Sequence, residues 1–129
     1  RRLGACLERY RLERYAAIFD ELKHLADRHH FKLMFVAFPV AEQVKMQFVD
    51  DFPQRKLLET AARLNIPVLD LLPTLRAAYQ KTYNIKELFY DQCHHTPAGN
   101  LIIANTINNF IDNCAADNSN ISGLKNIPQ

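Results

Sequence analysis

The chain has 129 residues, of which 16 are basic and 14 acidic, for a net charge of +2. A chain of this length usually forms one domain. Its hydrophobic fraction of 48% and charged fraction of 23% exclude a wholly disordered or collagen-like chain. The balanced charge gives no reason to expect a nucleic-acid partner, and no apolar run is long enough to span a membrane. The three cysteines make no disulfide framework, and nothing in the sequence identifies the cellular compartment.

The first half of the chain has a hydrophobic pattern that predicts alternating helices and strands. Apolar residues recur every three or four positions in Leu7–Arg28, which predicts a helix. The run Phe31–Phe38 is short and nearly all apolar, as is typical of a strand covered on both faces. Pro39–Pro53 lacks periodicity and predicts a loop, with room for a short helical turn. A second helix is expected at Gln54–Leu64, with Asn65 as its C-terminal cap.

The second half continues this alternation and then becomes polar. Ile66–Leu71 predicts a short buried strand, and Pro73 is well placed to start a helix. For the last helix, Thr96 is the expected cap and Pro97 the expected first residue. From Asn113 onward Asn, Asp, Ser and Gly dominate, so we expect a domain over residues 1–113 and a flexible polar tail over residues 114–129.

This order of elements favours an α/β fold with a parallel sheet. Two predicted strands are too few for a stable sheet, however. A strand as apolar as Phe31–Phe38 would also invite aggregation at an open edge. We therefore expect either a missing N-terminal portion or a second chain to pair with it.

The densest group of reactive side chains is the segment Asp91-Gln92-Cys93-His94-His95, directly before the last predicted helix. A carboxylate three residues before a histidine can accept a hydrogen bond from the imidazole across a tight loop. Such a bond fixes the tautomer of the ring and stabilises its protonated form. Asp91 and His94 therefore have the chemistry of a general base and its orienting acid.

The segment Asp91-Gln92-Cys93-His94-His95-Thr96-Pro97-Ala98-Gly99 resembles the last conserved block of the SGNH/GDSL hydrolases. That block has Asp-x-x-His, then a glycine five residues after the histidine, then an apolar helix. Gly99 stands at this spacing from His94, and Leu101, Ile102 and Ala104 follow. The looser resemblance covers Leu12 to Ile111, but only this last block is specific.

The resemblance implies a three-layer, flavodoxin-like α/β fold, of which this chain would be the C-terminal half, incomplete without the N-terminal strands. It also implies a serine esterase or O-acyltransferase that acts on a small-molecule or carbohydrate ester, with His94 as the base, Asp91 as its partner, and no metal or organic cofactor. The chain departs from the family in lacking a Gly-Asp-Ser block, since its serines are Ser119 and Ser122. The nucleophile is therefore expected outside this chain, and the chain alone is expected to be inactive.

Other interpretations of these residues remain. Asp91 and His94 could form a surface pair without a chemical task. Asp91, Cys93, His94 and His95 all have metal-ligating side chains, although adjacent ligands rarely reach one ion. Cys93 could be a nucleophile that uses His94, and Asp70 could enter a site or cap the following helix. The alternative for the whole chain is a non-catalytic interaction half-domain completed by a partner chain.

Overall fold

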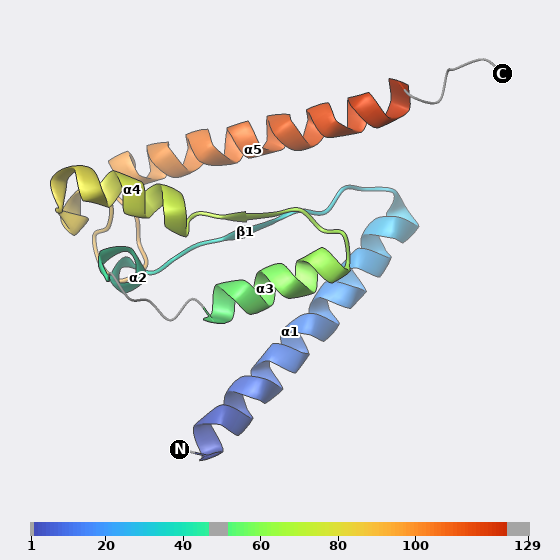
Figure 1. The fold of residues 1–129 in the computed structure, drawn as a ribbon, viewed down its shortest axis with the longest axis horizontal. Helices are drawn as coiled ribbons and strands as arrows, with labels where there is room; N and C mark the ends of the chain where they lie inside the picture. The colour runs from blue at the N-terminus through green and yellow to red at the C-terminus, as the bar shows by residue number, and fades with distance from the viewer. Residues whose placement is uncertain (1, 47–51, 124–129) are drawn as a thin grey trace. The chain divides into compact units, whose positions relative to one another are not determined.

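The computed structural model describes residues 2–46 and 52–123, and the described part is mostly helical (Figure 1). The helices are α1 (Arg2–His29), α2 (Ala41–Lys45), α3 (Phe52–Arg63), α4 (Leu72–Thr82), the 3-10 helix η1 (Ile85–Glu87) and α5 (Pro97–Gly123). The strands are β1 (Phe35–Ala37) and β2 (Val68–Asp70). Among the helices of these residues, none is both long and apolar enough to cross a membrane.

The expected flavodoxin-like α/β fold is wrong for this chain. The sheet found in residues 2–46 and 52–123 is a single parallel pair of three-residue strands, β1 and β2. The segment Phe31–Phe38 was expected to be one buried strand, but Phe31 and Phe38 are 46% and 55% exposed. This apolar run is therefore not a strand covered on both faces along its length, and only Phe35–Ala37 pairs with β2.

The chain divides into two compact units, and the first contains α1 and α3. The rings of Phe19 and Phe35 meet edge to face, with centroids 4.2 Å apart. Arg63 on α3 forms an ion pair with Asp20 on α1 at 3.5 Å. After α3 the backbone turns at Asn65, which has a φ of 53° and donates its N–H to the preceding turn. The predicted Asn65 cap is confirmed, because asparagine tolerates this left-handed conformation.

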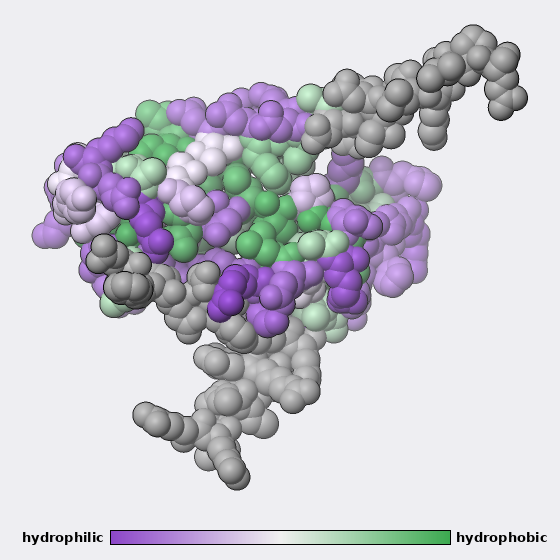
Figure 2. Space-filling view, viewed as in Figure 1, coloured by the Kyte–Doolittle hydropathy of each residue, from purple (hydrophilic) through white to green (hydrophobic). Residues whose placement is uncertain are grey.

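The second unit contains α2, α4, η1 and α5 and has its own hydrophobic core. Helix α4 packs against both α2 and α5. The buried core residues are Ala41, Val44, Leu71, Leu72, Leu75, Leu88, Phe89 and Ile103. Leu88 and Phe89 belong to this core and lead directly into the Asp91–His94 segment, so the reactive loop begins from a buried anchor. Hydrophobic residues also reach the surface, as Figure 2 shows.

The starts of α4 and α5 follow the sequence signals, and α5 continues into the polar segment that begins at residue 114. Pro73 lies in the first turn of α4, and Pro97 is the first residue of α5. The chain from residue 114, expected to be a flexible tail, is helical as far as Gly123. Polar residues such as Asn lower helix propensity by only a few tenths of a kcal/mol each, so they need not end a helix that has begun. Residues 124–129 lie outside the described residues.

Candidate functional site

The site is a tight loop closed at its base by backbone hydrogen bonds. Phe89 and His95 form an isolated antiparallel bridge. Tyr90 donates its N–H to the His94 carbonyl at 2.8 Å, and Thr96 donates its N–H to the Leu88 carbonyl at 3.0 Å. The residues between these bonds therefore have little freedom, and the loop is held directly before the N-terminus of α5.

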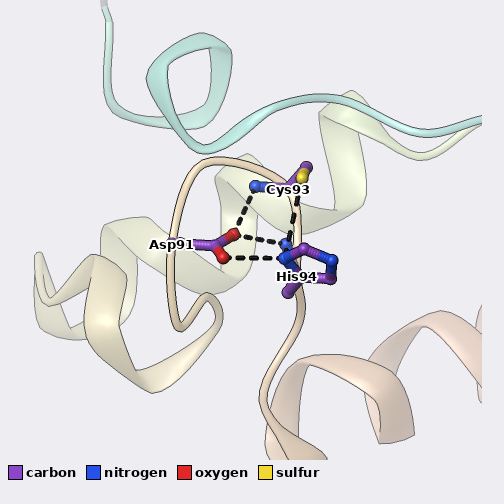
Figure 3. Close-up of side chains that lie close together, drawn as sticks. All are labelled: Asp91, Cys93 and His94. Atoms are coloured by element: carbon purple, nitrogen blue, oxygen red, sulfur yellow. Dashed lines mark hydrogen bonds and ion pairs between the residues drawn. The ribbon is translucent and has the colours of Figure 1, made fainter.

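Within the loop, both carboxylate oxygens of Asp91 are used (Figure 3). Oδ1 accepts the backbone N–H groups of Cys93 at 2.9 Å and His94 at 2.8 Å. Oδ2 lies 2.7 Å from Nδ1 of the His94 ring. The backbone N–H of Cys93, then the backbone and ring of His94, hold the pKa of Asp91 well below its usual range. Asp91 is therefore ionised over the whole physiological pH range.

This ionised carboxylate fixes the role of each nitrogen in the neutral His94 ring. A carboxylate only accepts hydrogen bonds, so Nδ1 must be the nitrogen that carries the proton. Nε2 is then the bare, basic nitrogen. The His94 side chain is 75% exposed, so a group from outside the loop can reach it. The hydrogen bond expected from the Asp-x-x-His spacing is present.

The neighbouring histidine has a different environment. The His95 ring is partly buried and packs on Phe89 and Phe38, with ring centroids 4.4 and 6.1 Å away. Burial, and next the charge of His94, lower the pKa of His95. Its Nε2 is buried without a hydrogen-bond partner. His95 is thus a packing residue, and His94 alone has the arrangement of a general base.

Thr96 and Gly99 fix the loop to α5. The Thr96 hydroxyl accepts the N–H of Gly99 at 3.1 Å, as an N-cap should, and donates to the Glu87 carbonyl. A Cβ on Gly99 would lie 2.3 Å from the carbonyl oxygen of Leu88. The absence of a side chain at Gly99 therefore permits α5 to approach the Leu88 backbone closely.

The loop also contacts the segment that follows β1. The N–H of Ala41, the first residue of α2, donates to the carbonyl of Gln92 at 2.9 Å. This bond satisfies one of the helix N–H groups that have no partner within the helix. Together with the contact between the rings of Phe38 and His95, it places the loop beyond the carboxyl end of β1.

The sequence leaves the roles of Asp70 and Cys93 open, and the structure shows the surroundings of both. Asp70, one residue before the N-cap Leu71, accepts the N–H of Leu72 at 2.9 Å and so satisfies one N–H group at the start of α4. Cys93 is exposed, and its Sγ lies 3.8 Å from Nδ1 of His94. One ligand atom each of Asp91, Cys93 and His94 lies within 4.8 Å of the others. Adjacency of the ligands therefore does not prevent their convergence here. The spacing Asp-x-Cys-His is the sequence signal for this cluster, because a carboxylate that accepts the N–H groups two and three residues later draws these residues together.

Comparisons with protein-family models, curated proteins and solved structures find no match for this chain.

Proposed function

We propose that Asp91 and His94 are the acid–base pair of a serine ester hydrolase or O-acyltransferase. The observation that carries the proposal is the 2.7 Å contact between Asp91 Oδ2 and His94 Nδ1. It leaves Nε2 of an exposed ring free to take a proton. The nine-residue resemblance to the SGNH/GDSL block supports the same assignment of the two residues.

The proposed reaction needs a serine from outside these 129 residues. His94 Nε2 takes the proton of the serine hydroxyl while the serine oxygen bonds to the ester carbonyl carbon. The tetrahedral intermediate then collapses, its bond to the alcohol oxygen breaks, and His94 returns the proton to the departing alcohol. Water or a second alcohol attacks the acyl-serine in the same way, which gives hydrolysis or acyl transfer. Asp91 stays ionised throughout and stabilises the protonated ring.

The substrate class in this proposal is an ester of a small molecule or carbohydrate. The partner that supplies the serine would be another segment of the polypeptide or a second chain that pairs with the segment Phe31–Phe38. The exposed Phe31 and Phe38 side chains favour such a partner, since burying them would stabilise the complex. They equally favour the second candidate function, a non-catalytic half-domain that a partner completes.

The test is serine-directed labelling of the gene product that contains this segment and of the 129-residue chain alone. We expect a fluorophosphonate probe to label the gene product, and an aryl acetate to be hydrolysed by it. His94→Ala should lower kcat by about 10²–10⁴-fold, the usual contribution of a general base. His95→Phe keeps the aromatic packing and should lower kcat far less.

The 129-residue chain alone should show neither labelling nor hydrolysis. Robust hydrolysis by this chain that survives His94→Ala would overturn the proposal. A gene product that neither labels nor hydrolyses esters would favour the interaction half-domain.

A further inference from the structure

Three side chains with different metal-binding chemistry converge on one face of the reactive loop. They are the carboxylate of Asp91, the thiol of Cys93 and the imidazole of His94, and Figure 3 shows them turned toward one another. All three are exposed. We propose that Asp91 Oδ2, Cys93 Sγ and His94 Nδ1 form a binding site for a divalent transition-metal ion of the zinc class.

The three ligand atoms lie within 4.8 Å of one another, and one of their separations is already close to that of a tetrahedral site. Zinc bonds of about 2.3 Å to sulfur and about 2.05 Å to nitrogen place two tetrahedral ligands about 3.6 Å apart. Cys93 Sγ and His94 Nδ1 are 3.8 Å apart. Asp91 Oδ2 and His94 Nδ1 are 2.7 Å apart. They must move to about 3.4 Å, the separation of an oxygen and a nitrogen ligand on a tetrahedral zinc ion. Both side chains are largely exposed, so this movement requires no repacking of the buried core.

The backbone already holds the loop in the shape that the metal needs. Asp91 Oδ1 accepts the N–H groups of Cys93 and His94, and these bonds do not involve Oδ2. Oδ2 can therefore leave the His94 ring and bind an ion while Oδ1 keeps the three residues together. Ordering the loop for metal binding costs little free energy, because the ligands are preorganised.

The ligand set selects the kind of metal. A thiolate and an imidazole favour zinc, cobalt and similar ions over magnesium and calcium, which prefer oxygen ligands. Binding releases the Cys93 thiol proton to solvent. His95 contributes no ligand, because its ring lies between Phe38 and Phe89. Three protein ligands leave an open position that water can fill.

Metal binding and the proposed acid–base chemistry exclude one another. An ion on Nδ1 moves the proton of the neutral His94 ring to Nε2, which can then no longer accept a proton from serine. This regulatory consequence rests on the proposed function, whereas the metal site itself does not. Zinc would act as an inhibitor of the hydrolase and not as its cofactor.

The test is titration of the full 129-residue chain with Co²⁺, followed by the thiolate-to-cobalt charge-transfer absorption, and displacement by Zn²⁺. We expect one equivalent of Co²⁺ to produce the band. Cys93→Ser should abolish it, although Cys6 and Cys114 remain. His94→Ala should weaken binding at least about tenfold, since even the loss of an outer partner of a ligand has that effect. Cys114→Ser is the matched control and should leave the titration unchanged.

Cys93 and His94 are exposed, and Cys114 is half-buried but keeps its size in Cys114→Ser, so the circular dichroism of the variants should match that of the unmodified chain. Absence of a thiolate band in the unmodified chain would overturn the proposal. So would a band that survives Cys93→Ser or disappears with Cys114→Ser. The assay contains no ester, and the serine-labelling assay contains no metal, so either proposal can fail without the other.

Discussion

Gly99 in the first turn of α5 lies against the backbone carbonyl of Leu88, so close that a Cβ at this position would be 2.3 Å from the oxygen. Leu88 is buried in the core of the second unit and precedes the reactive loop. The same carbonyl accepts the N–H of Thr96 on the far side of the loop. This contact therefore joins the core, the loop and the last helix.

Gly99→Ala should destabilise the protein by about 1–3 kcal/mol, as overpacking usually does. In an open helix the same change would stabilise by roughly 0.5–1 kcal/mol, so the sign of the effect tests the contact. Chemical denaturation measures it, with Asn105→Ala on the exposed side of α5 as control. An unchanged or raised free energy of unfolding for Gly99→Ala would show that α5 does not approach Leu88 this closely.

Thr96→Val should also destabilise the protein, by about 1–2 kcal/mol. The change keeps the shape of the side chain but removes the hydroxyl that caps Gly99 and donates to the Glu87 carbonyl. Thr96→Ser retains the hydroxyl and should recover most of the loss. Thermal unfolding of the two variants measures the difference. A Thr96→Val variant as stable as the unmodified chain, or no less stable than Thr96→Ser, would show that the hydroxyl bonds do not supply this stabilisation.

The stability should fall in mild acid because of His95. Its pKa is lowered in the folded protein, so the unfolded chain binds the proton more readily. The stabilisation is complete above the usual histidine pKa and is lost as the pH falls from that value toward the lowered one. His95→Phe keeps the packing on Phe38 and Phe89 and should flatten this dependence. His24→Phe, at an exposed position on α1, should leave it unchanged.

Midpoints of thermal unfolding across this pH range check the prediction for His95. The opposite result would be an unfolding midpoint that still depends steeply on pH in His95→Phe and no longer depends on pH in His24→Phe. That outcome would assign the titrating group to α1 and not to the reactive loop.

The local features of the site could be predicted from sequence because each depends on residues within a few positions. The Asp91–His94 contact spans three residues, and the Thr96 cap spans three as well. The sheet could not be predicted in this way. Pairing of β1 with β2 joins segments more than 30 residues apart, and apolar character alone did not fix how much of Phe31–Phe38 would pair.

The position of Cys93 was the other feature missed at the site. The usual sequence spacings of metal ligands describe residues on regular elements or in longer loops. They do not account for a turn in which one carboxylate binds two successive N–H groups. That turn brings Cys93 Sγ to the same nitrogen that Asp91 contacts.

In this structure the Asp91 carboxylate holds the neutral His94 ring with its proton on Nδ1, which leaves Nε2 without a proton. The most direct test is a long-range proton–nitrogen correlation spectrum of the ¹⁵N-labelled chain in metal-free alkaline buffer, where histidine rings are neutral. We expect the His94 ring to be predominantly the Nδ1–H tautomer and Asp91→Ala to abolish this preference. A His94 ring that is mainly the Nε2–H tautomer, with the same spectrum in Asp91→Ala, would contradict this expectation.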